Sequence, residues 1–241
     1  MSVFKVRPVG NNIQIINPYT QPSIEPTIVY VPVEEKKKYS LRVDEDAVVD
    51  IPPGVKEIFI SLVGGGGAGG LGTIKDGISF SGGGGGSGFG IREIPIRITD
   101  VSNVSIDCKI GKGGCGVTPL GGDTIVKIIV NGSENTCLTG GGGNPGGSGS
   151  KNNGGLGGYG QNTRSKGGFK GSTSIPSHPP IGGSGGASLF AAGGKGTSYH
   201  LQDLSEGNGK CGSGGGGKIP TSPYETPTKG GDGFVMVEYF E

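Results

Sequence analysis

Short apolar runs along residues 39–138 predict a set of β-strands. In residues 39–43 apolar and polar side chains alternate, which is typical of a strand with one buried face. In residues 55–63 both alternating faces are apolar, which predicts a strand covered on both sides. Further strands are predicted at residues 47–51, 91–98, 104–110, 123–130 and 233–240.

The last of these strands follows a long glycine-rich insert, residues 139–232, in which no helical or strand periodicity is visible. A C-terminal strand as apolar as residues 233–240 should dock into the early β core at 39–138. The expected organisation is therefore one glycine-rich domain, residues 39–241, closed by its two ends with the insert looped out between them.

Residues 1–38 differ in kind, because they contain five prolines and few glycines. Proline fixes φ and removes a backbone donor, so this stretch predicts an extended arm with edge-strand pieces. The arm is either an anchor on a partner or on a neighbouring copy, or a loose leader. The candidate anchor side chains are Ile13, Ile15, Ile28 and Tyr30.

Glycine accounts for 56 of the 241 residues, far more than tight turns need. The glycine blocks are either flexible linker or extended threefold helices of the polyglycine type, which have three residues per turn and no internal hydrogen bonds. Spaced apolar residues that could act as clamps favour the ordered helices. These residues are Leu71, Ile74, Phe80, Phe89, Leu156, Tyr159, Phe169, Leu189, Phe190, Tyr199 and Leu201.

Several motifs occur in a fixed order between residue 50 and the C-terminus. An Asp-Ile-Pro-Pro-Gly-Val turn at 50–55 leads through a strand into glycines, and Ile110-Gly111-Lys112-Gly113-Gly114 follows later. The order continues with the sequences at 121–126, 139–143 and 230–239. This arrangement resembles the glycine-rich domain of phage tail-fibre and related virion proteins over roughly residues 39–241.

The resemblance implies an all-β fold: a small β-sandwich-like core with packed polyglycine-II-type helices and long glycine-rich loops. It also implies a surface or fibre component of a virus particle. Loops between the glycine helices would present partner contacts. The candidates are Tyr159, Arg164, Lys170, His178, Tyr199, His200 and Tyr224. Phe169 and Phe190 are instead interpreted as clamps.

The sequence offers little for catalysis, and we expect no enzyme, cofactor or metal site. It has two histidines, no phosphate-binding loop and no C-x-x-C zinc spacing. The four cysteines are expected to be reduced, packed thiols. Cys108 and Cys115 are the candidate disulfide pair, because a strand turning through the intervening glycines could bring them together.

The net charge of +1 gives no electrostatic case for nucleic acid. No apolar run approaches a membrane span, and the N-terminus has no secretory h-region. We therefore expect a protein made in the host cytoplasm without a signal peptide, and the resemblance implies that it is located in the virion.

Three functions fit these patterns. The first is a structural virion protein, either minor capsid or fibre/vertex, that packs against other virion proteins or copies of itself. The second is an adhesin whose loops contact a host surface glycan or protein. The third, an ice-binding protein, is disfavoured because the glycine blocks vary in length and carry Lys, Arg and Phe.

Overall fold

A computed structural model describes most of the chain as two separate units, residues 1–37 and 38–241. The described residues are 36–99, 103–116, 118–148, 165–172, 180–197, 207–219 and 226–241, with the backbone of five further short strands. The fold is all-β, as predicted: the strand pairs are antiparallel and the described residues contain essentially no helix.

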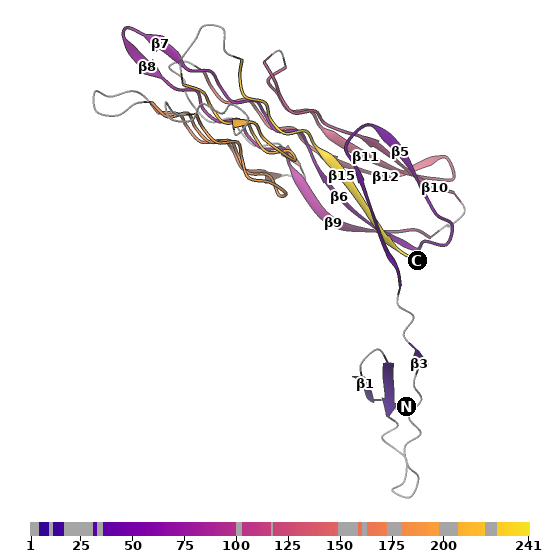
Figure 1. Cartoon of the computed structure of the whole chain (residues 1–241). Coiled ribbons are helices and arrows are strands. Elements are labelled where there is room, and N and C mark those ends of the chain that lie inside the picture. Colours follow the sequence, from indigo (N-terminus) through magenta and orange to yellow (C-terminus); the bar gives the residue numbers. More distant parts are fainter. Residues whose placement is uncertain are drawn as a thin grey trace, which may run out of the picture. The chain divides into compact units, whose positions relative to one another are not determined.

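The first unit contains a three-stranded sheet of order β1-β2-β3 (Figure 1). Its strands are β1 (Lys5–Val9), β2 (Asn12–Ile16) and β3 (Val31–Pro32). The apolar stretches between the prolines pair with one another through their backbones, so over these residues the arm forms a small sheet.

The second unit contains two four-stranded sheets, which we call the sandwich. One has the order β4-β15-β6-β9 and the other the order β12-β11-β10-β5. The first comprises β4 (Lys38–Val43), β15 (Phe234–Phe240), β6 (Glu57–Val63) and β9 (Gly90–Arg97). The second comprises β12 (Ser133–Gly140), β11 (Thr124–Val130), β10 (Val104–Lys109) and β5 (Ala47–Ile51). The C-terminal strand β15 pairs with both β4 and β6 and lies between them.

Side chains of both sheets form one apolar core. On β6, the alternate residues Ile58, Ile60 and Leu62 are fully buried in it. The second sheet contributes Ile106 and Val126, which are equally buried. The opposite face of β6 is half-buried at its start and becomes fully buried at its last residues. The prediction that this strand is covered on both faces is therefore confirmed at the last residues of β6, directly before the glycines at 64–67.

Two paired elements whose side chains are described were not predicted from the sequence. The edge strand β12 is mostly polar and exposed, so it lacks the apolar alternation that marks the other strands. Asn131 and Gly132, both with positive φ, form the tight turn that connects it to β11. A short hairpin of β7 (Thr73–Lys75) and β8 (Ile78–Phe80) turns through Asp76 and Gly77, which also have positive φ.

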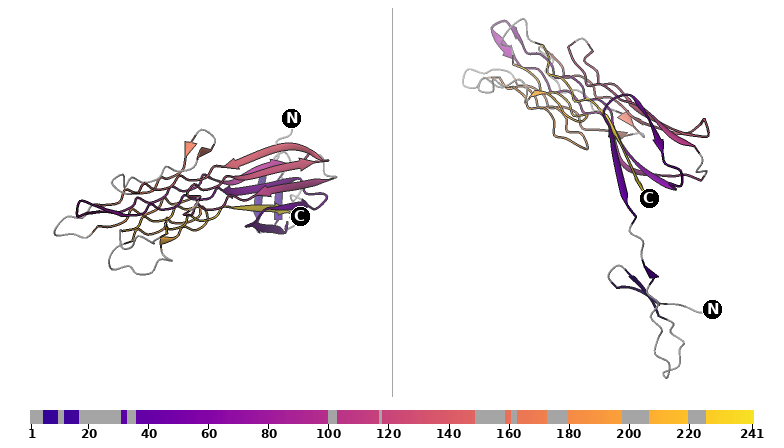
Figure 2. Two further views of the ribbon diagram at one scale, coloured as in Figure 1. Left: turned by 90° about the horizontal axis from the view of Figure 1, so that it is seen from above. Right: turned by 45° about the vertical axis from the view of Figure 1, so that its right-hand side comes forward.

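The sandwich strands continue without a break into extended glycine segments, which we call the glycine bundle (Figures 1 and 2). Its described segments are residues 64–72, 81–89, 110–116, 118–123, 141–148, 165–172, 180–197, 207–219 and 226–233. The β7–β8 hairpin lies at the end of the bundle remote from the sandwich (Figure 1).

Backbone hydrogen bonds join these segments with a three-residue repeat. In residues 64–70, every third amide donates to the same neighbour. Gly64, Gly67 and Gly70 donate to residues 83–89, Gly65 and Ala68 to residues 119–122, and Gly66 and Gly69 to residues 228–231. The carbonyl groups of 64–70 accept from three more segments, at 114, 143–146 and 215–218. Residues 64–70 are thus bonded to six neighbours and are buried throughout.

Candidate interaction surfaces

The structure describes only part of the predicted contact set. Lys170 lies exposed on segment 165–172. Tyr159 and Arg164 pair across the two-stranded hairpin of β13 (Tyr159–Gly160) and β14 (Thr163–Arg164), and their side chains lie outside the described residues. His178, Tyr199, His200 and Tyr224 also lie outside the described residues.

The structure also describes only some of the candidate anchor residues. Ile13 and Ile15 lie on β2, where Ile13 is opposite Pro8 of β1 and Val31 of β3. Ile28 and Tyr30 are outside the described residues.

None of the four cysteines forms a disulfide, so the candidate pair Cys108–Cys115 is not bonded in this structure. Cys108 lies on β10 and faces the sandwich core, whereas Cys115 lies in the glycine bundle with its Sγ 3.5 Å from Thr118 Oγ1. Burial raises the pKa of the Cys108 thiol to about 11, with a smaller contribution from the negative charge of Asp107. Cys108 is therefore a packed, unreactive thiol.

Arg42 connects three parts of the second unit: its own strand β4, strand β15 and the glycine segment at 207–219. Its guanidinium lies 4.3 Å from the ring centroid of Phe234, and Phe234 in turn meets the ring of Phe190 edge to face. The same guanidinium pairs with Asp44 at 2.9 Å and lies 3.6 Å from the Cys211 sulfur. These contacts raise the pKa of Arg42, chiefly through the hydrogen bond to Asp44. Phe190 is a clamp, as expected, and Arg42 was missed because its partners are distant in sequence.

The His, Cys, Asp and Glu side chains of the described residues form no metal-binding cluster, because no three of them gather in a way that could hold a metal ion. A depression of about 610 Å³ beside Arg42 contains two thiols, from Cys115 and Cys211, and no histidine. Within the described part of the chain there is also no helix long and apolar enough to cross a membrane.

An exposed layer of the glycine bundle presents side chains in a regular array. Segment 165–172 is bonded to 180–186 through the amides of Phe169 and Ser172, and 180–186 is bonded to 192–197 through those of Gly182 and Gly185. On the inner side these segments bond to 81–89 and 212–218. We call the outer side the triplet face. Its exposed side chains are Lys166, Phe169, Ser172, Ile181, Ser184, Ala192 and Lys195.

The spacing of these residues could have been detected in the sequence. Lys166-Gly-Gly-Phe169, Ile181-Gly-Gly-Ser184 and Ala192-Gly-Gly-Lys195 each place a side chain at every third position. With three residues per turn, such positions fall on one side of an extended helix. A pattern of apolar clamps does not reveal this spacing, because the triplet positions also carry Lys, Ser and Ala.

Phe169 corrects one of those clamp assignments. It is 69% exposed, and Ile181 on the adjoining segment is 53% exposed, so neither side chain packs into the bundle. Ile74 and Leu189, also expected to be clamps, are exposed too. The bundle needs few clamps because its segments are joined by backbone hydrogen bonds, and side chains on its outermost layer have nothing to pack against.

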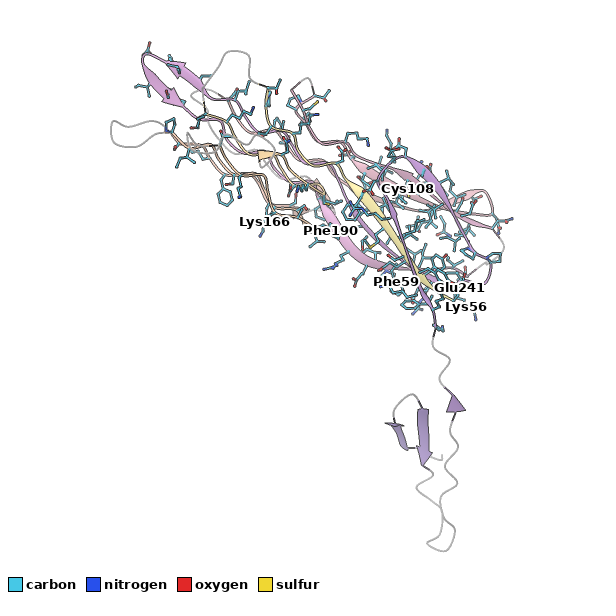
Figure 3. All side chains as sticks on the ribbon, viewed as in Figure 1. Lys56, Phe59, Cys108, Lys166, Phe190 and Glu241 are labelled. Carbon is cyan, nitrogen blue, oxygen red and sulfur yellow. The ribbon has the colours of Figure 1, made fainter. Side chains whose placement is uncertain are left out.

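A shallow depression of about 300 Å³ lies at one end of the triplet face. It is lined by Phe89, Gly90, Ser165, Lys166, Ala187, Ser188 and Leu189. Figure 3 shows Lys166 on the glycine bundle and Lys56 at the far end of the sandwich. The depression combines apolar walls with two hydroxyl groups and an ammonium group.

Comparison with known proteins finds one family. The family model described as a glycine-rich domain matches residues 43–240, which is nearly all of the second unit. No curated protein is similar enough to the chain to count as a match.

Proposed function

Because the chain belongs to the glycine-rich domain family, we propose that it is a non-enzymatic structural component of a virus particle, in a minor capsid or fibre role. The observation that carries this proposal is the glycine bundle, in which residues 64–70 are hydrogen-bonded to six neighbouring segments. A bundle joined through its backbone suits a rigid spacer that packs against other virion proteins or further copies of itself. The order of motifs that resembles phage tail-fibre proteins supports the location in a particle.

We also infer that the glycine segments are threefold helices of the polyglycine-II type. The support is the hydrogen-bond direction, which returns to the same neighbour after three residues in 64–70 and again in 81–89. Removal of Cβ atoms allows such helices to approach closely enough to exchange N–H···O bonds. Ordering many glycines costs backbone entropy, which these bonds must offset.

The first unit is proposed as the anchor. It divides from the glycine-rich domain at Lys37, directly before β4 begins at Lys38. Deletion of residues 1–37 should therefore abolish incorporation into particles and leave the circular dichroism spectrum of the second unit unchanged. If the truncated chain is still incorporated at the normal level, the arm is not the anchor.

Immunolabelling of particles purified from the source of the chain tests the structural role itself. Antibodies against the full chain should label particles, either when they are intact or only after they are opened. Labelling only after opening would indicate an internal packing position, and labelling at a fibre tip or vertex an external one. The structural proposal is wrong if neither state is labelled above the level given by pre-immune serum.

Attachment to a host receptor is the second candidate function. The observation favouring it is the β7–β8 hairpin at the remote end of the bundle, where Ile74 and Ile78 are 64% and 44% exposed. The two side chains lie on opposite faces of the hairpin, because Ile74 is paired with Ser79 and Ile78 with Lys75, so the tip offers an apolar contact to a partner on either side. The full chain should then bind host cells and compete with infection. Replacing both isoleucines by serine should remove that binding, whereas unchanged binding would exclude the hairpin.

A further inference from the structure

We propose that the triplet face binds an acidic polysaccharide. Charge is the first reason. Residues 139–232 contain eight Lys and Arg and four Asp and Glu, a net charge of +4, whereas the rest of the chain has 13 and 16, a net charge of −3. The triplet face lies within the basic part. Its segments 165–172 and 180–197 contain Lys166, Lys170 and Lys195 and no acidic residue.

The exposed aromatic ring is the second reason. Phe169 is 69% exposed between Lys166 and Lys170, and Ile181 lies on the adjoining segment. The C–H face of a sugar ring stacks on an exposed aromatic ring, while its carboxylate or sulfate groups pair with nearby ammonium groups. A single exposed phenylalanine flanked by lysines matches both parts of an acidic sugar.

The shape of the face favours an extended chain. Three segments lie side by side, and with a rise of about 3.1 Å per residue their triplet positions recur roughly every 9 Å. Ser184 adds an exposed hydroxyl group to the array, whereas the hydroxyl group of Ser172 is bonded to the backbone of Ile181. The depression of about 300 Å³ at its end, with Lys166 and Ser165 in its lining, is large enough for a sugar ring. Binding of a polysaccharide here is independent of the packing role proposed above.

Heparin oligosaccharides, neutral dextran and poly-glutamate are suitable probes for titration of the full chain. We expect heparin oligosaccharides to bind at 50 mM salt, dextran not to bind, and poly-glutamate to bind at least tenfold more weakly. Affinity for heparin should fall as salt is raised, because the lysines contribute through charge. Absence of heparin binding at 50 mM salt would overturn the proposal.

Variants then locate the binding. Lys166→Gln combined with Lys195→Gln should weaken heparin binding tenfold or more, and Phe169→Ala by about fivefold. The control for charge is Lys56→Gln at the far end of the sandwich (Figure 3). The control for the aromatic ring is Phe240→Ala on β15, where the ring is also exposed. Both controls should change the affinity less than twofold, and circular dichroism verifies the fold of every variant.

Two results would assign the face to something else. Equal losses from Lys56→Gln and Lys166→Gln would mean that heparin responds to charge anywhere on the chain, and would exclude a site on the triplet face. Equal affinity for poly-glutamate and heparin, with Phe169→Ala unchanged, would indicate an acidic protein partner and would also overturn the polysaccharide proposal.

Discussion

Individual glycines in the bundle are fixed by contact with neighbouring backbones. A Cβ added at Gly66 would overlap the carbonyl oxygen of Ser213, and one added at Gly82 would overlap that of Gly70. Neither position has a positive φ, so close approach, and not backbone conformation, is the reason for glycine. Ala68 is an exception, because its methyl group fits inside the bundle although the residue is fully buried.

Gly66→Ala is therefore expected to destabilise the second unit strongly. The added methyl group cannot be accommodated without moving the segment at 213, and overpacking of this kind costs about 3 kcal/mol. The matched control is Gly116→Ala, where the new Cβ would lie at an ordinary 3.4 Å from the Cδ atom of Pro227. Urea unfolding of both variants measures the difference. Equal midpoints for the two would contradict close packing at Gly66.

The raised pKa of Cys108 predicts a loss of stability in alkali. The thiol ionises at about 11 in the folded chain and at an ordinary value of 9.0 when exposed, so its contribution is complete below pH 9. Between pH 9 and about 11 the thiol is ionised in the unfolded state but still largely protonated in the folded state. The free energy of unfolding therefore falls as the pH rises through this range. At pH 10.5 the loss should be about 2 kcal/mol relative to pH 8.

Cys108→Ala isolates this effect from other groups that titrate in alkali. The variant should be less stable at pH 8, because it removes a buried sulfur, but its stability should fall less between pH 8 and 10.5. Parallel urea titrations at the two pH values provide the comparison. An identical fall in wild type and variant would show that Cys108 ionises as an exposed thiol does.

At the scale of elements, the junction between strand and glycine segment decides the architecture. β6 runs directly into residues 64–70. The Thr124 hydroxyl group connects this junction to the one between β10 and residues 110–116. The hydroxyl donates to the carbonyl of Val63 at 2.8 Å and accepts from the amide of Gly111 at 3.0 Å. One side chain at the start of β11 thus joins the last residue of β6 to the glycine segment at 110–116.

Ile60→Asp tests how completely β6 is covered. The side chain of Ile60 has no exposure, and an unpaired carboxylate there would be desolvated in the sandwich core. We expect loss of the folded state, a cost above roughly 4 kcal/mol. Val48→Asp, on β5 at 64% exposure, should be tolerated. A soluble Ile60→Asp protein with the protease resistance of the Val48→Asp protein would contradict burial of this strand.

At the scale of the whole chain, the sequence predicted the sandwich strands well and the surface of the bundle poorly. The strand at 55–63 is recognisable because one of its faces, with Ile58, Ile60 and Leu62, is buried and apolar throughout. β12 has no such face, because it lies at a sheet edge. Phe169 was misassigned because composition alone cannot distinguish an inner glycine segment from an outer one. That distinction depends on which segments become neighbours.

Continuity of strands and glycine segments predicts that the second unit unfolds in one step. Tyr39 and Tyr239 stack at 5.2 Å in the sandwich, so the fluorescence of a variant that keeps only these two of the seven tyrosines reports that part, while hydrogen exchange of residues 64–70 reports the bundle. Since β6 and residues 64–70 form one uninterrupted stretch with shared hydrogen bonds, neither part can lose its order alone. In urea the two probes should give the same midpoint, and Gly66→Ala should lower both equally. Exchange of 64–70 at urea concentrations where the tyrosine signal is still native would show that the bundle opens separately from the sandwich.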